Sequence, residues 1–308
     1  MPQFDNVYPY ISYITAAGDE IVLSCAAYKK WWECYGRTGF AAPPLKHITQ
    51  ETADGAMDTL AIELQARTLK IQMVISGGTS LERDTILNDI ASRLLQIGHR
   101  QSWGKLKILK TNGNYVYIDC AYIGGMDEIS VSMPRAQLFE LSFYAGKACF
   151  YDETETTYNI VIYNPSANLL HFGNGFHFGA GTHFLSAGAY FTENIQLEGF
   201  RAYPVITITG RVGNVSLENA ATGRIIDLSN GFSLRPGETV VIDTTPQQRS
   251  VTITRRNGTE ENGYNYLSPD TNLDWFLTGG VNEVIYCQPD NNPDTSCVLR
   301  YQQMRLSA

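Results

Sequence analysis

Three histidines form the pattern in this sequence that comes nearest to a metal site. His171, His177 and His183 recur every six residues, with glycines between them. The even spacing places all three on one face of an extended chain, and imidazole is a common zinc ligand. Six residues of strand span roughly 20 Å, too far for one ion to bridge, so only tight turns at 173–175 and 179–181 would gather the rings. We therefore expect structural histidines in a glycine- and aromatic-rich segment, and no bound metal.

Residue types that serve catalysis occur without the spacing that catalysis needs. The sequence contains no GxSxG, HExxH or P-loop motif. Glu218, Glu238 and Asp243 could be read as a glycosidase pair, but acidic residues at strand ends more often serve turns. The glycine-rich run 173–181 lacks the lysine and the following helix of a nucleotide loop. We predict neither an enzyme nor a cofactor.

The cysteines do not indicate a metal or redox motif. No two of them form a CxxC pair, which excludes zinc-finger and thioredoxin-like spacing. Cys287 and Cys297 could pair across a hairpin, although free buried thiols are expected for a protein made in a reducing cytoplasm. The six are Cys25, Cys34, Cys120, Cys149, Cys287 and Cys297.

Composition limits the function classes. The 308 residues favour two domains, and 44% apolar residues allow packed cores. The formal net charge of −8 and the absence of a basic tract disfavour a nucleic-acid reader. No apolar run is long enough to cross a membrane, and the first residues do not resemble a signal peptide. The sequence predicts a soluble protein made in a cytoplasm, with no membrane partner.

The first half of the chain is predicted to be a β domain with one helix. Residues 58–76 alternate as one long strand with a bulge near Arg67. Trp31 and Trp32 precede a glycine-bearing loop, and we interpret them as core or subunit-interface anchors, with a ligand platform as the alternative.

One helix is predicted over 80–97. Thr79 is a suitable N-cap, and Glu82 completes a capping box. An apolar stripe recurs at helical spacing at Ile86, Leu87, Ile90, Leu94 and Leu95. The polar face, which includes Arg83 and Arg93, is interpreted as solvated or as an intersubunit face.

A hairpin is predicted over 105–123, because Asn112-Gly113 is the pair preferred in a type I′ turn. Residues 136–144 are the last strand of the first domain, which we expect to end near residue 152.

The second half reads as an antiparallel sandwich, since short β-rich runs alternate with turn residues from 200 to 286. Four motifs here resemble the C-terminal domain of siphophage distal tail proteins. They are Pro204-Val-Ile-x-Ile-x-Gly210, Asn219-x-x-Thr222-Gly223, Gly237-Glu238 followed by Ile242-Asp243-Thr244, and Leu277-x-Gly-Gly280-x-Asn282.

The resemblance implies a fold and a domain order. The fold class is mainly β: an N-terminal β domain with one α-helix over 1–152, a linker or insertion over 153–195, and a C-terminal β-sandwich of galectin-like or carbohydrate-binding-like type over 196–308. We expect the last of these to fold alone.

The resemblance also implies a structural role at the phage tail tip, without catalysis. The protein would form a homohexameric ring that joins the tail tube protein to the tail hub or tail-associated protein. Tape measure, receptor-binding and fibre proteins are further partners. Trp31, Trp32, Arg83 and Arg93 are interface guesses. DNA would pass through the channel without specific binding, and the strands at 58–76 and 105–123 are candidates for the channel wall.

The alternative function is a carbohydrate-binding module that grips the host surface. A sandwich of this type could present Tyr264, Tyr266 or Trp275 to a sugar. Exposure of these rings as one platform would distinguish it from a purely structural domain.

Overall fold

The chain folds into two compact units. The computed structural model describes residues 11–23, 31–51, 57–76, 79–95, 103–110, 112–128, 136–162, 189–288 and 294–308. Unit 1 comprises Met1–Glu153 and Met304–Ala308, and unit 2 comprises Thr154–Gln303. The polypeptide therefore passes from unit 1 to unit 2 and back again.

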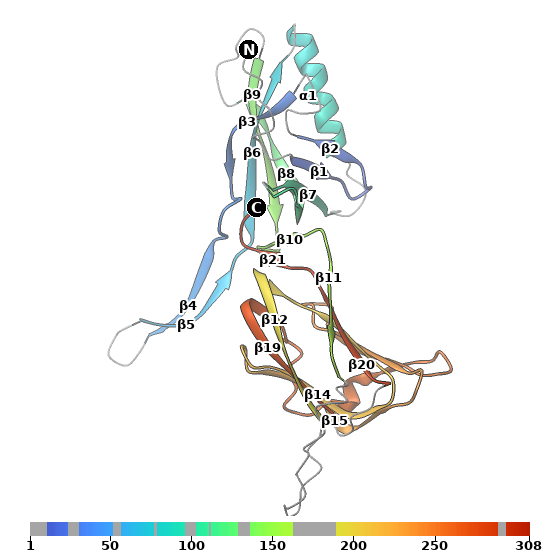
Figure 1. Cartoon of the computed structure of the whole chain (residues 1–308). Coiled ribbons are helices and arrows are strands. Elements are labelled where there is room, and N and C mark those ends of the chain that lie inside the picture. Colours follow the sequence, from blue (N-terminus) through green and yellow to red (C-terminus); the bar gives the residue numbers. More distant parts are fainter. Residues whose placement is uncertain are drawn as a thin grey trace, which may run out of the picture. The chain divides into compact units, whose positions relative to one another are not determined.

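Unit 1 is built from two antiparallel sheets that share one long strand (Figure 1). The first half of β8 pairs with β7 and β10, and its second half pairs with β9. One sheet runs β2-β1-β7-β8-β10-β21 and the other β3-β6-β9-β8. The strands are β1 Ile11–Ile14, β2 Glu20–Val22, β3 Trp31–Thr38, β6 Arg67–Ser76, β7 Gly104–Leu109, β8 Tyr115–Glu128, β9 Ala136–Ala145, β10 Phe150–Asp152 and β21 Met304–Arg305.

The predicted helix is confirmed as α1, Ser80–Leu94. The Thr79 side chain accepts a hydrogen bond from the Glu82 backbone N–H at 3.2 Å, as the capping motif predicts. Ile86, Ile90 and Leu94 are buried in the core of unit 1. Leu95 was predicted to belong to the same stripe, which is wrong: it is 50% exposed. It is the C-cap, where the backbone has left the helical path.

The predicted long strand at 58–76 is two strands. β5, Met57–Leu64, pairs with β4, Leu45–Glu51, whereas β6 pairs with β3 and β9. The change of parity near Arg67 marks this break and not a bulge within one strand. β6 begins at Arg67, whose side chain is buried.

Arg67 is 2% exposed and has no carboxylate among its described contacts. Its guanidinium donates to the backbone carbonyls of Gly39, Ala41, Ala148 and Leu306 and lies over the Phe150 ring. Burial lowers the pKa of Arg67 from its ordinary value. One side chain thus ties four separate segments of unit 1 together, including the returning residues near the C-terminus.

The hairpin of β7 and β8 is confirmed, but its turn differs from the expectation. Lys110 N–H donates to the Asn114 carbonyl, and Gly113 N–H donates to the Lys110 carbonyl. The loop between Lys110 and Asn114 therefore has three residues, one more than a type I′ turn has. Gly113 has a φ of 85°, as the glycine of such a three-residue loop requires.

Unit 2 is a β-sandwich, which confirms the predicted fold class for this half of the chain. One sheet runs β15-β14-β19-β12 and the other β11-β20-β13-β16-β17-β18. A single core of aliphatic and aromatic side chains fills the space between them. The elements are β11 Thr156–Ile160, β12 Ala189–Ala202, β13 Val205–Thr209, β14 Val212–Asn219, β15 Arg224–Leu234, β16 Thr239–Asp243, β17 Ser250–Thr254, β18 Glu260–Asn262, η1 Gly263–Tyr266, β19 Leu277–Gln288 and β20 Ser296–Tyr301.

The residues of the four family-like motifs hold unit 2 together from inside. Asn219 and Asn282 are fully buried and bond to each other, Nδ2 of Asn219 to Oδ1 of Asn282 at 3.1 Å. Asn282 also donates to the carbonyls of Ile195, Thr278 and Gly280. These contacts join β12, β14 and the start of β19. A buried amide this fully satisfied fixes the register of the strands around it.

The other two motifs are structural as well. Thr244 is buried and its hydroxyl donates to the Pro204 carbonyl at 2.8 Å. Gly210, at a φ of 98°, lies so close to the Asp294 carbonyl that a Cβ would overlap it. Glu238 accepts from Arg235 N–H and from Arg255 Nη1. The contacts described for these motif residues are therefore structural ones within unit 2.

Candidate interaction surfaces

The β4–β5 hairpin is an arm of unit 1 (Figure 1). Within the described ranges each of its strands pairs only with the other, Leu45 opposite Leu64 and Glu51 opposite Met57. Leu45 is 52% exposed at the base. A two-stranded hairpin is marginal in water without a surface to pack on, so this arm is suited to lie on another molecule.

An apolar patch lies on the outer face of β8 and β9. Trp103 and Tyr144 pack ring against ring at 6.1 Å, and Tyr144 lies opposite Ala121 in the register. Trp103, Ile123 and Tyr144 are 47%, 56% and 41% exposed. We call these three residues the Trp103 patch. Grouped exposed rings of this kind are typical of protein–protein contact.

The neighbouring face of β7 and β8 is polar and close to charge balance. Lys105 lies over the Tyr117 ring at 4.9 Å, and Lys107 over the Tyr115 ring at 4.4 Å. Lys107 also pairs with Glu20 at 3.6 Å. These lysines are held by aromatic rings and a carboxylate of the same protein.

Two tyrosine–carboxylate pairs complete this face. Tyr117 donates to Glu153 at 2.6 Å, and Tyr151 donates to Asp119 at 2.7 Å. Burial, and then the neighbouring carboxylate, raises the pKa of both phenols, so they remain neutral donors. Lys105 and Lys107, on the hairpin proposed as a channel wall, therefore already have partners.

The four predicted interface residues remain predictions. Trp31 and Trp32 lie on β3 opposite Ile75 and Val74, but their side chains are outside the described residues. Arg93 pairs with Asp89 on the exposed side of α1 at 3.1 Å, and Arg83 is half-buried on the same helix.

The three rings considered for a glycan platform differ in exposure. Trp275 is fully buried in the core of unit 2, so its ring cannot stack on a sugar. Tyr266 is tied to Glu261 and Arg255. Only Tyr264 is exposed, at 41%, and its hydroxyl donates to the Arg249 carbonyl. The three rings lie near each other along the chain, but Trp275, the largest, packs into the core.

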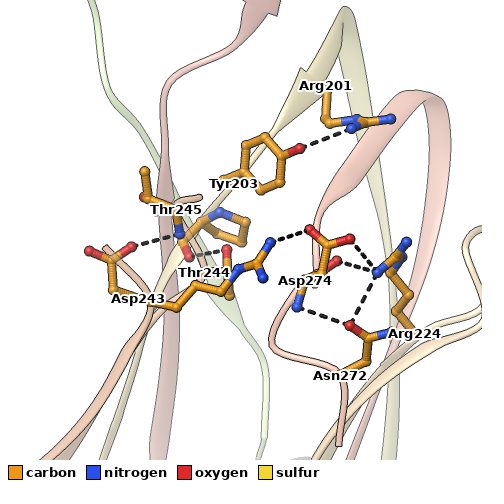
Figure 2. Close-up of polar contacts among 10 residues, drawn as sticks. Arg201, Tyr203, Arg224, Asp243, Thr244, Thr245, Asn272 and Asp274 are labelled. Atoms are coloured by element: carbon orange, nitrogen blue, oxygen red, sulfur yellow. Dashed lines mark hydrogen bonds and ion pairs between the residues drawn. The ribbon is translucent and has the colours of Figure 1, made fainter. Parts of the chain in front are cut away.

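The acidic residues considered for catalysis hold turns and ion pairs. Hydrogen bonds from Arg235 N–H and from Arg255 lower the pKa of Glu238. A carboxyl with a lowered pKa stays ionised and cannot act as a general acid at neutral pH. Asp243 accepts the Thr245 N–H at 2.8 Å (Figure 2). Nothing in this arrangement provides the two opposed carboxyl roles of a glycosidase.

No metal-binding group of histidine, cysteine and acidic side chains occurs in the part of the chain that the structure describes. His171, His177 and His183 lie outside it. Cys120, Cys149, Cys287 and Cys297 form no disulfide, and burial raises the pKa of Cys120 to about 12, which makes its thiol unreactive. Neither helix among the described residues is long and apolar enough to cross a membrane.

An arginine cluster in unit 2 was missed by sequence reasoning. Asp274 pairs with Arg224 at 2.7 Å and with Arg249 at 2.6 Å (Figure 2). Arg201 and Arg224 both lie over the Phe276 ring. The residues come from separate segments of unit 2, so no spacing rule along the chain could have found them.

No family model matches this chain, and no curated protein sequence matches it. Solved structures do. The crystal structure of the Dit protein of phage SPP1 is 11% identical, covers 96% of this chain and 98% of its own, and gives a TM-score of 0.58; its title describes a paradigm of the hub adsorption apparatus in phages that infect Gram-positive hosts. Two structures of the phage P2 baseplate in its activated conformation, with Ca and with Sr, cover the same shares at 11% and 12% identity, each with a TM-score of 0.40.

The likeness to SPP1 Dit confirms the resemblance to distal tail proteins at the level of the fold. It runs through both units and leaves almost no part of either chain unmatched. The fold is that of a phage distal tail protein.

Proposed function

We propose that this chain is a distal tail protein, a structural subunit of a phage virion without catalytic activity. Six copies would form a ring that joins the tail tube to the hub or fibre proteins of the tail tip. The observation that carries the proposal is the match to SPP1 Dit over 96% of this chain, which includes both units. A shared sandwich alone would support no function, because sandwiches serve many.

Three features of unit 1 support self-assembly. The β4–β5 arm needs a surface to pack on, the Trp103 patch is an exposed apolar surface, and β3 pairs on one side only, with β6, among the described strands. Arm and patch are different surfaces, so contact between them is head-to-tail. Such heterologous contacts close into rings when the rotation between copies allows it.

The polar face of β7 and β8 fits the passage of DNA. Binding to duplex DNA grows with each lysine or arginine that pairs with a phosphate. Lys105 and Lys107 are already held by Tyr117, Tyr115 and Glu20. A wall of this kind would let DNA slide without gripping it.

Imaging tests the ring. The purified chain, alone or with its tail-tube and hub partners, is expected to form closed rings of six copies in negative-stain microscopy. Mass photometry of the chain alone is expected to give a species with six times the mass of one chain. Ile123→Lys is expected to abolish them, because it buries a charge in the contact. Val281→Lys in unit 2, at a similar exposure of 60% against 56%, is the matched control and is expected to leave them intact. One copy per tail, or an open filament, would refute the ring.

A further inference from the structure

The arginine cluster of unit 2 is centred on one phenylalanine. The guanidinium carbons of Arg201 and Arg224 lie 4.1 and 4.9 Å from the centre of the Phe276 ring, and Tyr203 packs beside it at 5.9 Å. Phe276 is only 9% exposed, so these neighbours cover it. Guanidinium groups held over an aromatic ring have a fixed plane, which suits them to bidentate recognition.

The cluster has more hydrogen-bond donors than its own acceptors use. Arg201 donates one hydrogen bond, from Nη1 to Tyr203 Oη at 2.9 Å, and has no carboxylate partner among the described residues (Figure 2). A guanidinium has five N–H donors. The hydrogen bonds of Arg224 all leave from Nη1, toward Asn272 Oδ1 and Asp274. Tyr203 Oη, which accepts from Arg201, keeps its own hydrogen to donate.

The cluster also has more positive than negative charges. Arg201, Arg224 and Arg249 meet a single carboxylate in their described contacts, that of Asp274. This positive cluster lies on a chain whose formal net charge is −8. Arg224 and Arg249 have a structural task, since they hold Asp274 in place. Arg201 packs on aromatic rings but holds no carboxylate, and its remaining donors have no acceptor among the described residues.

We propose that this cluster binds the phosphate group of a phosphorylated sugar or polyol. Arg201 and Arg224 would fork the phosphate oxygens, while the Tyr203 hydroxyl and the Asn272 amide would meet the hydroxyl-bearing part. A protein partner would instead need an apolar centre to desolvate. Here Phe276 is already covered, and what remains is charged and polar. The site goes beyond the ring proposed above and does not depend on it.

Calorimetric titration of the full chain tests the site. The probes are glucose 1-phosphate and glycerol 3-phosphate, compared with glucose, glycerol and inorganic phosphate. We expect saturable binding of the two esters, weaker binding of inorganic phosphate and none of the neutral compounds. Arg201→Gln is expected to weaken ester binding at least about tenfold, because a charged hydrogen bond is lost. Arg201→Lys keeps the charge but not the fork, and is expected to weaken it as well.

The control is Arg300→Gln, which removes an exposed arginine from β20 in the other sheet. It is expected to change affinity less than twofold. Equal losses in the two glutamine variants would mean general charge attraction and would overturn the site, as would absence of saturable binding. Binding only to phosphatidylglycerol vesicles, or only to an acidic virion protein, would overturn it too. Ring size and melting temperature of Arg201→Gln should match the wild type, which separates failure of this site from failure of the ring or the fold.

Discussion

The two units use their side chains differently. In the described part of unit 2 the buried polar residues bond to one another and to the backbone of distant strands, as Asn219, Asn282 and Thr244 do. In the described part of unit 1 the buried polar set is smaller, and more large apolar side chains are exposed. Those in unit 1 are Leu45, Leu81, Leu95, Trp103, Ile123 and Tyr144, against Val161, Tyr264 and Val281 in unit 2.

This difference separates two tasks. The buried polar contacts of unit 2 fix the register of its strands, because only one register satisfies them. Unit 1 leaves apolar surface that another protein surface would cover. Recognisable sequence motifs accordingly lie in unit 2, where the fold requires them, whereas the proposed assembly surfaces of unit 1 have no motif.

The sharpest test of the comparison is whether unit 2 folds by itself. We expect fragment 154–303 to melt cooperatively with all-β circular dichroism, and fragment 196–308 to remain unfolded. The shorter fragment lacks β11, which pairs with β20, and the first part of β12, which pairs with β19. It also loses Ile160, Ile162 and Ile195 from the core. This replaces the sequence-based expectation that 196–308 folds alone, and a cooperative melt of 196–308 would restore it.

Within unit 2, Asn282→Ala is expected to lower the free energy of unfolding by about 3–5 kcal/mol. It removes the bond between the two amides and the side-chain donor to the Ile195, Thr278 and Gly280 carbonyls. Asn194→Ala, at an exposed position on β12, should change it by less than about 0.5 kcal/mol. Chemical denaturation of fragment 154–303 measures both. Similar losses in the two variants would mean that the amide network does not specify unit 2.

In unit 1, Arg67→Met is expected to cost about 2–4 kcal/mol, since four carbonyls lose a charged donor. Lys70→Met is the control on the same strand. Lys70 is 47% exposed and pairs with Glu140 at 2.7 Å, which is worth at most about 1 kcal/mol. Denaturation of the full chain, followed by circular dichroism, should show the loss in Arg67→Met only. An unchanged midpoint would mean that backbone pairing alone holds the four segments.

A smaller effect depends on pH. The folded-state pKa of Glu238 lies below its ordinary value of 4.5, through the Arg235 N–H and then Arg255. Its contribution is present above the unfolded pKa and is lost as pH falls through the lower, folded pKa. Glu238→Gln should therefore be less stable than wild type at pH 7, by about 1 kcal/mol, and the gap should close toward pH 3. Melting temperatures of fragment 154–303 across this range decide it; a constant gap would assign the loss to packing.

The smallest expected change separates stability from assembly. Arg93→Ala removes an exposed pair with Asp89 on α1, which is worth about 0.3–0.5 kcal/mol. If Arg93 lies in the ring interface as predicted, ring dissociation should rise far more than this stability loss accounts for. Dilution followed by mass photometry measures it, and unchanged dissociation would remove Arg93 from the interface.

Local patterns allowed much of the fold to be predicted. The N-cap at Thr79 and the strand over 136–144 depend on neighbours a few residues apart, and both are confirmed. The strands of unit 2 follow from the same kind of pattern. The failures needed information from elsewhere in the chain. The partners of Arg67 include a carbonyl as distant as that of Leu306, and the burial of Trp275 depends on the packing of two sheets.

The surfaces were harder to predict than the fold. The hydrogen bond between the motif residues Asn219 and Asn282 joins positions 63 apart. A local sequence pattern could not predict it. Arg201 lies on β12, Arg224 on β15 and Phe276 just before β19, so their spacing along the chain carries no information about the cluster. The motifs that carry the family resemblance are largely buried residues such as Asn219 and Asn282. They predict the fold, but they do not show which ligand or protein binds at the surface.

The return of residues 304–308 to unit 1 has a consequence for synthesis. Unit 1 begins before unit 2 in the sequence and is completed after it, because β21 and the Leu306 carbonyl follow all of unit 2. A chain that stops early, or is cut inside unit 2, lacks its second half and also leaves Arg67 short of a partner and Asp152 without Arg305. A truncated chain is therefore expected to be less stable in unit 1, the unit proposed to form the ring.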